Sequence, residues 1–246
     1  MDETRQTRQP TKRVPQKAHK QSTYLPKLYG RRQGKSLKPR QMRLMETLLP
    51  SITIPDPTSE NIDPKELFPD AKSIWLELGF GGGEHLATLA KDHPDIGFIG
   101  AEPFLDGIGK LLAMIADEDV KNIRLLPGDG RPLLEAVPNN SIERLFVLHP
   151  DPWPKRRHFK RRLVSPWFFK EAARIMPSNG ILRIASDVPD YVRWTLMHAQ
   201  NSKDFQWLAK TAADWQNRPS DWPATRYGEK SIREGRSPIY LTFRRQ

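Results

Sequence analysis

The chain has 246 residues, no cysteine and a formal net charge of +11, which suits one sizeable domain with an appendage. The lack of cysteine excludes disulfides, thiolate metal sites and cysteine nucleophiles, so we expect a cytoplasmic protein without a metal ion. No apolar run approaches the roughly 18 residues that a membrane span needs, and no secretory segment follows Met1, so we expect no membrane partner.

The excess of positive charge lies at the start of the chain. Residues 1–43 contain 13 Lys or Arg and only two acids, whereas the other residues carry 27 charges of each sign. This leader is poor in aliphatic residues, so we predict a disordered basic arm over 1–43 and a folded domain over 44–246. The arm is either an idle solvated tail or a segment that finds nucleic acid by releasing counterions from phosphates.

From Ser73 onward, short apolar runs alternate with amphipathic segments. The apolar runs predict strands over 73–78, 96–101, 123–126, 144–148 and 180–185. The amphipathic segments predict helices over 84–91, 105–115, 166–176 and 191–200. This alternation indicates an α/β fold whose parallel sheet is covered by helices on both faces. Two further strands, over 205–209 and 239–243, are separated by a Trp- and Pro-rich loop and suggest an antiparallel edge.

The first predicted strand ends in a glycine-rich loop. Ligands of open α/β sheets bind beyond the carboxyl ends of the strands, where Glu77 precedes a loop that contains Gly79 and Gly81. Such glycines let a cofactor lie against bare backbone, although a plain tight turn is the alternative. Glu84 stands where a dinucleotide fingerprint requires Gly or Ala, and no P-loop lysine follows. The loop therefore favours a ligand without phosphates and with a positive centre, such as S-adenosylmethionine.

Acids also end the second and third predicted strands. Glu102 lies 23 residues after Gly79, close to the offset of about 20 residues at which an acid binds ribose hydroxyls. Asp129 ends the third strand, where it can accept a hydrogen bond from an adenine amino group. Each acid alone has a plain alternative, an exposed glutamate or a D-G turn. Three acids at successive strand ends favour a cofactor site.

The fourth predicted strand ends in the motif HPDPWPKRRHFKRR, residues 149–162. Pro150 and Pro152 fix the backbone on both sides of Asp151 and exclude helix there. Methylation of an exocyclic amine needs an acceptor for the leaving proton, whereas guanine N7 carries a lone pair and no hydrogen. Asp151 therefore needs no role as a general base, and we predict that it stabilises a purine that gains positive charge.

The same motif continues in a dense group of cations. Six of the eight residues over 155–162 are basic, which favours a polyanion such as RNA over a small neutral metabolite. A solvated helix face is the alternative, but like charges at this density repel one another without an anion to bind. We predict substrate contacts from Lys155, Arg156, Arg157, Lys160, Arg161 and Arg162.

Together, these motifs closely resemble those of the tRNA (guanine-N7-)-methyltransferases, class I enzymes that depend on S-adenosylmethionine. The likeness covers about residues 44–245 and is carried by LELGFGGGE, GAE, HPDPWPKRRHFKRR, ASD and TRYGEKSIREGR. It implies a Rossmann-like fold with a mostly parallel seven-stranded sheet and an antiparallel edge. The implied cofactor contacts are Glu77, Glu102, Asp129 and Asp151, with Asp151 also catalytic. The implied substrate contacts are Lys155, Asp187 and the segment 225–228.

The chain departs from the family pattern in two motifs. His149 stands where the family often has Phe, and Gly228 replaces the Glu of its T-x-F-E motif. We predict substrate contacts from Thr225, Arg226 and Tyr227, and we treat Gly228 as a backbone position. The neighbouring Glu229 is a candidate to supply the missing carboxylate by a small shift of the loop.

Histidine and tryptophan complete the candidate features. The six histidines show no metal-binding spacing, and we expect His149 to pack or cap. Trp207, Trp215 and Trp222 either stack on unpaired bases or form a small core, and the sequence leaves both open.

The sequence therefore predicts transfer of a methyl group from S-adenosylmethionine to N7 of a guanosine in tRNA, by a monomer. A helper subunit, another RNA or a protein as substrate, and a non-catalytic RNA-binding module with the same fold are the alternatives. Intact acids at the strand ends speak against the last, because a scaffold has no need for them.

Overall fold

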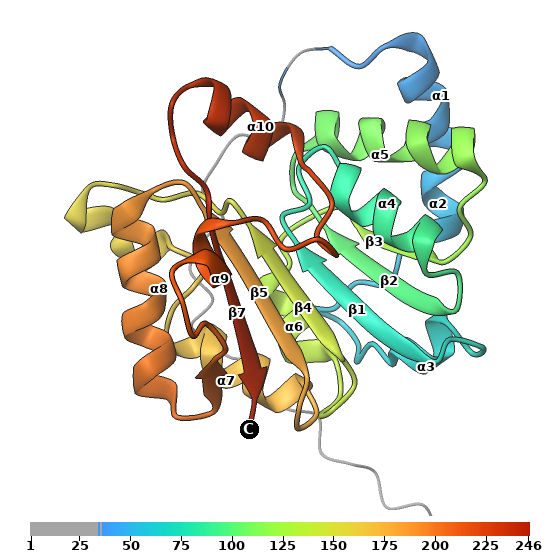
Figure 1. The fold of residues 1–246 in the computed structure, drawn as a ribbon. Helices are drawn as coiled ribbons and strands as arrows, with labels where there is room; N and C mark the ends of the chain where they lie inside the picture. Colours follow the sequence, from blue (N-terminus) through green and yellow to red (C-terminus); the bar gives the residue numbers. More distant parts are fainter. Residues whose placement is uncertain (1–33, 35) are drawn as a thin grey trace, which may run out of the picture.

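The centre of the molecule is a twisted sheet, which a computed structural model describes for Gly34 and residues 36–246 (Figure 1). Its five parallel strands are β1 Ser73–Leu78, β2 Ile96–Ala101, β3 Ile123–Leu126, β4 Arg144–Leu148 and β5 Ile181–Ser186. They confirm the five predicted strands, with β5 displaced by one residue. Most of the predicted basic arm lies outside the described residues.

The order of the strands places the ligand site. The described sheet runs β3-β2-β1-β4-β5-β7-β6, so the chain moves outward from β1 to β3 and then returns to the other side of β1 with β4. Ligands of open α/β sheets bind where the order reverses in this way, beyond the carboxyl ends of the strands. The ends of β1 and β4, at Leu78 and Leu148, therefore mark the expected crevice.

Two antiparallel strands close one edge of the sheet. β7 Ile239–Arg245 runs antiparallel to β5 and to the short outer strand β6 Phe205–Trp207, which confirms the predicted antiparallel edge. The prediction of a loop between these two strands is wrong, because two helices, α9 Ala213–Gln216 and α10 Arg226–Arg233, form there. The two buried residues of α10 are Gly228 and Ser231, and neither is a large apolar residue. The sequence of α10 therefore has no apolar stripe that would predict a helix.

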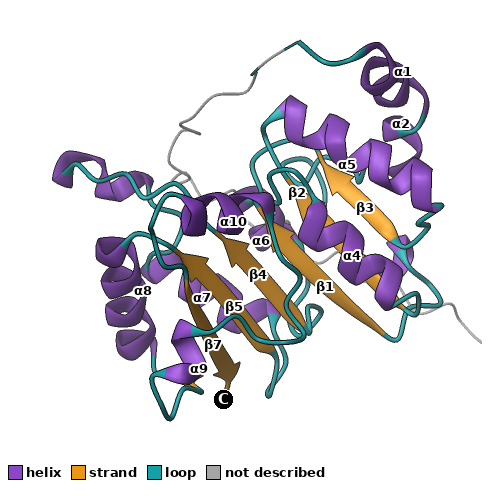
Figure 2. Ribbon diagram, turned by 45° about the horizontal axis from the view of Figure 1, so that its top comes forward, coloured by secondary structure: helices purple, strands orange, loops and turns teal. Residues whose placement is uncertain are grey.

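Helices cover both faces of the sheet, as predicted (Figure 2). The helices on one face are α1 Pro39–Thr47, α2 Leu49–Ile52, α4 Glu84–Asp92 and α5 Leu105–Glu118. Those on the other face are α6 Arg131–Ala136, α7 Pro166–Ile175 and α8 Pro189–Ser202, while α3 Pro64–Leu67 precedes β1. Successive strand side chains alternate between the two cores, with Leu76 in one and Trp75 in the other. No helix within the described range is long and apolar enough to cross a membrane.

Local signals set the starts of several helices. The Ser165 side chain accepts a hydrogen bond from the backbone N–H of Phe168, and Pro166 occupies the first position of α7. Pro189 starts α8 in the same way. These caps fix where the amphipathic pattern becomes a helix.

The helix α1 begins inside the predicted arm. Its first residue is Pro39, and Arg40 pairs with Asp117 of α5. Gly109 of α5 has no side chain, which leaves room for Leu37 and Gln41 to pack closely. The division between a disordered arm and a folded domain stays a prediction, and truncation experiments need to preserve α1.

Candidate active site

The predicted acids lie at one edge of the sheet. Glu77 is the penultimate residue of β1, and Glu102 and Asp151 follow β2 and β4. Burial raises the pKa of Glu102 most, and the charges of Asp151 and Glu77 raise it further. The strand ends thus form an acidic crevice at the switch point.

The loop after β1 offers bare backbone to this crevice. Gly79 and Gly81 have φ values of 74° and 57°, a left-handed conformation that favours glycine. A Cβ atom built on either residue would meet nothing within 4 Å, so open space lies directly beside the loop. On its other side the loop touches α5, where a Cβ atom on Gly107 would lie 2.0 Å from the carbonyl oxygen of Gly81.

Glu102 ties this loop to the next strand. One oxygen of its carboxylate accepts a hydrogen bond from the backbone N–H of Gly81 at 2.8 Å, and the other accepts from Phe104 at 2.9 Å. Burial raises the pKa of Glu102, although these two hydrogen bonds oppose the rise. A carboxylate has about four acceptor sites, so Glu102 can hold the loop and still accept hydrogen bonds from a ligand.

Glu77 has a partner that sequence reasoning missed. Its carboxylate lies 2.8 Å from Nδ1 of His85, which belongs to α4, and only 2% of the Glu77 side chain is exposed. The spacing of eight residues across a strand, a loop and a helix gives no sequence signal for this pair. Direct contact between Glu77 and a cofactor stays a prediction, since little of its surface faces the crevice.

Asp129 is also partly occupied. Arg131, the first residue of α6, reaches back with Nε and Nη2 to both oxygens of the Asp129 carboxylate, at 2.6–3.0 Å. Its backbone N–H donates to the same carboxylate at 3.0 Å. Asp129 therefore orders the start of α6, and its predicted hydrogen bond to adenine stays a prediction.

Asp151 lies in a tight turn after β4. His149 and Trp153, on either side of the Pro-Asp-Pro sequence, have positive φ values of 51° and 41°, which are uncommon for residues with side chains. Asp151 is exposed at the crevice, and no side chain in the described part of the chain bonds to or pairs with its carboxylate. Partial burial of this carboxyl group raises its pKa. The turn thus presents a carboxylate that no described side chain occupies.

The basic run forms a short 3-10 helix, η1 Arg156–Arg161, next to this turn. Its exposed cations are Lys155, Arg156, Arg157 and Lys160. Arg161 is half-buried, and its guanidinium lies 4.9 Å from the centre of the Trp153 ring.

Arg162 corrects one prediction. Its side chain is 0% exposed, donates to the carbonyl of Pro152 at 2.8 Å and pairs with Asp190. The guanidinium is also enclosed by aromatic rings, the nearest being that of Phe159 at 3.8 Å. A side chain buried in this way cannot bind tRNA, so Arg162 supports the turn that carries Asp151.

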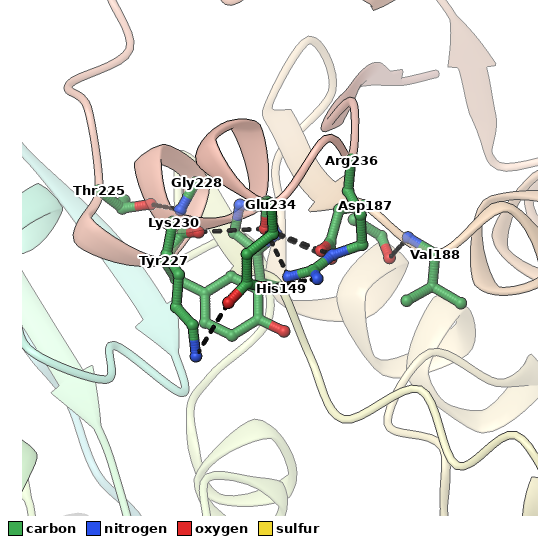
Figure 3. Close-up of polar contacts among 11 residues, drawn as sticks. His149, Asp187, Val188, Thr225, Tyr227, Gly228, Lys230, Glu234 and Arg236 are labelled. Carbon is green, nitrogen blue, oxygen red and sulfur yellow. Dashed lines mark hydrogen bonds and ion pairs between the residues drawn. The ribbon is translucent and has the colours of Figure 1, made fainter.

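The segment 225–228 forms the start of α10, and Tyr227 lies beside His149 in the turn that carries Asp151 (Figure 3). Oγ1 of Thr225 caps the helix by accepting from the backbone N–H of Gly228 at 3.0 Å. Tyr227 is 48% exposed, and its ring centre lies 4.8 Å from that of His149. Arg226 is exposed and approaches Glu84 at 3.9 Å. This arrangement is suited to holding a flat substrate group near Asp151.

Gly228 is a buried backbone position, as predicted. A Cβ atom there would lie 3.1 Å from Oγ1 of Thr225 and 3.6 Å from Nε2 of His149. Glu229, the next residue of α10, is exposed. Its role as a substitute for the missing Glu stays a prediction.

Asp187 also departs from its predicted role. Its side chain, only 3% exposed, accepts hydrogen bonds from Oγ of Ser231 at 2.7 Å and Nε of Arg236 at 2.6 Å. Burial acts to raise the pKa of Asp187, but these hydrogen bonds outweigh it and hold the pKa below its ordinary value. Asp187 is thus bonded to the protein and has almost no surface for the predicted direct contact with substrate.

The tryptophans divide between the two explanations. Trp222 is buried against Tyr240, with ring centres 5.3 Å apart, and Trp215 packs against the other core. Trp207 is the most exposed of the three, at 38%. His149 packs, as expected, and burial lowers its pKa although Asp187 opposes this. Within residues 36–246, no group of three or more His, Cys, Asp or Glu could hold a metal ion.

Comparison with known proteins agrees with this geometry. Residues 71–241 match a family model described as a putative methyltransferase. A solved structure described as an antibiotic-related methyltransferase superposes with a TM-score of 0.50 and 12% identity, over 74% of this chain and 92% of that one. At this identity the superposition supports the fold alone. The fold and the family model together define a Rossmann-like class I methyltransferase.

Curated relatives narrow the family. The chain is 49% identical to the tRNA (guanine-N(7)-)-methyltransferase of Rhodospirillum rubrum, over 89% of this chain and 88% of the relative. It is 48% identical to the enzyme of the same name from Paramagnetospirillum magneticum, over 90% and 93%. The chain therefore belongs to the tRNA (guanine-N(7)-)-methyltransferase family.

Proposed function

We propose that this chain transfers a methyl group from S-adenosylmethionine to N7 of a guanosine in tRNA. The observation that carries the proposal is the carboxylate of Asp151, which has no bonded partner among the described residues and shares its end of the sheet with the bare glycine loop and the exposed cations next to η1. Family membership favours tRNA as the substrate. Because tRNA is used in the cytoplasm, the proposal also places the enzyme there.

The crevice fits the cofactor on two grounds. The open space beside Gly79 and Gly81 leaves room for a ligand against the backbone. The raised pKa of Glu102 reflects burial together with repulsion from Asp151 and Glu77, and a ligand with a sulfonium and an ammonium group relieves that repulsion. Glu102 would hold the ribose hydroxyls with its remaining acceptor sites, while Asp151 would lie nearest the methyl group.

The cofactor, when bound, supplies the methyl group to be transferred. Guanine N7 would accept that methyl group through its lone pair, and the electron pair of the broken carbon–sulfur bond would stay on the sulfur atom of the cofactor. No proton leaves N7, so no general base is needed. The purine becomes cationic, and the Asp151 carboxylate stabilises this charge because no described side chain uses its acceptors.

The tRNA lies across the edge of the crevice in this proposal. Lys155, Arg156, Arg157 and Lys160 are exposed beside Asp151 and bind backbone phosphates. Arg161 stacks on Trp153 and extends the same surface. Tyr227 presents a flat ring to the base, and Thr225 fixes the helix that carries it.

A methylation assay tests the proposal. The protein is incubated with tRNA and labelled S-adenosylmethionine, and the digested nucleosides are identified by mass spectrometry. We expect label in 7-methylguanosine only. Label in another nucleoside would refute the proposed target atom, and a failure to bind S-adenosylmethionine in calorimetry would indicate a non-catalytic RNA-binding protein instead.

A further inference from the structure

One buried carboxylate joins three segments at the edge of the crevice. Asp187 follows β5, and its Oδ2 atom accepts from Ser231, within α10, and from Arg236, three residues beyond it. The two donors lie 2.7 Å and 2.6 Å from this atom. Arg236 also pairs with Glu234, which gives the end of α10 a second fixed point (Figure 3).

The other oxygen of the same carboxylate faces the turn that carries Asp151. Oδ1 of Asp187 lies 3.6 Å from Nδ1 of His149, too far for a good hydrogen bond, although the two side chains are direct neighbours. His149 is two residues before Asp151 and has a positive φ of 51°. Its ring packs against Tyr227, so His149 links the turn that carries Asp151 to α10.

Polar anchors rather than apolar packing hold α10 in place. Its buried residues are Gly228 and Ser231, whereas Ile232 is 61% exposed. Ser231 is fully buried, and its hydroxyl lies 3.1 Å from the carbonyl of Tyr227 as well as near Asp187. A helix with so little apolar burial depends on these few bonds for its position.

We propose that Ser231 and Arg236 are positioning residues that act through Asp187 to hold α10 against the Asp151 turn. Thr225 and Tyr227 then face Asp151 at a fixed distance, and the target guanosine is bound in line with the methyl group. The inference rests on the proposed function, because it assigns these residues a role in binding the tRNA substrate. It replaces the expected contact between Asp187 and substrate with an indirect one.

The test compares variants that remove a donor to Asp187 with a variant that removes an arginine elsewhere in the fold. Arg236→Ala removes the donor to Asp187, and Ser231→Ala removes the second donor with a smaller change in volume. Arg174→Ala is the matched control, because Arg174 also bonds several groups, including the carbonyls of Leu134 and Val137, but belongs to α7, away from α10. The measurements are kcat and KM for tRNA, KM for S-adenosylmethionine, the melting temperature and amide hydrogen exchange across 225–236.

We expect Ser231→Ala and Arg236→Ala each to raise KM for tRNA roughly tenfold or more, as the loss of a charge-assisted hydrogen bond implies. KM for S-adenosylmethionine should stay near the wild-type value, and the amides of α10 should exchange faster. Arg174→Ala should lower the melting temperature while leaving both KM values unchanged. Unchanged KM for tRNA in Ser231→Ala and Arg236→Ala, or an equal rise in Arg174→Ala, would overturn the inference. A wild-type protein without tRNA methylation would instead refute the proposed function.

Discussion

The contact between the glycine loop and α5 allows a sharp prediction. A Cβ atom on Gly107 would lie 2.0 Å from the carbonyl oxygen of Gly81, and real Cβ contacts essentially never fall below 3.0 Å. In Gly107→Ala, the two backbones must therefore separate by about 1 Å. A shift of that size breaks or strains the 2.8 Å hydrogen bond from Gly81 to Glu102 and displaces the loop beside the cofactor.

Gly109→Ala is the natural control on the same helix. Its new Cβ atom would lie 3.0 Å from Leu37 and 3.3 Å from Gln41, both of them side-chain contacts that can yield. Both substitutions gain the helix propensity of Ala over Gly, about 0.5–1 kcal/mol. Any difference between the two variants therefore reports the clash with the loop.

Calorimetric titration with S-adenosylmethionine measures the effect. The strained hydrogen bond to the Glu102 carboxylate is of a kind that contributes about 1.5–3 kcal/mol, so we expect the affinity of Gly107→Ala for the cofactor to fall about 10- to 100-fold. Overpacking should also destabilise it by about 1–3 kcal/mol. Gly109→Ala should bind the cofactor as the wild type does. Equal affinities for the two variants would show that the close approach of loop and helix does not shape the cofactor site.

Three further predictions concern the acid, the cations and the arm. Asp151→Ala should lower kcat by about 100-fold or more without a large change in melting temperature, and near-normal turnover would exclude Asp151 from catalysis. Partial burial raises the pKa of Asp151, so kcat/KM should fall as the pH drops through that raised value. The residual activity of Asp151→Asn should not show this fall at low pH, and a fall that persists would point to Glu102. Arg157→Ala should weaken tRNA binding and reduce its salt slope by about 0.9. Arg162 is buried, so Arg162→Ala should chiefly lower the melting temperature, and the opposite pattern would contradict this burial. Deletion of residues 1–33, which preserves α1, should weaken tRNA binding and flatten the salt slope, and an unchanged slope would mean that the basic arm is idle.

The sheet was predictable because its signals are local. Each parallel strand is a short apolar run, and each acid of the crevice lies near the end of such a run or within three residues after it. The Pro-Asp-Pro turn was recognisable for the same reason, since proline restricts its neighbours wherever it stands.

The polar anchors were not predictable, because they join residues that are distant in the sequence. Arg162 is buried through Asp190, 28 residues later, and Asp187 is bonded to Ser231, 44 residues later. Sequence alone counted Arg162 as one of six similar cations and Asp187 as an available acid. The helix α10 was not predicted either, because a cap and ion pairs stabilise it and its sequence has no apolar stripe.

The central claim is that the methyl group goes to guanine N7, and replacement of that atom tests it most directly. Two tRNA transcripts are compared, one with guanosine and one with 7-deazaguanosine, whose ring carries C–H in place of N7. With labelled S-adenosylmethionine, we predict methyl transfer to the first transcript and none to the second. Equal incorporation into both transcripts would show that the enzyme methylates another atom and would contradict the role assigned to Asp151.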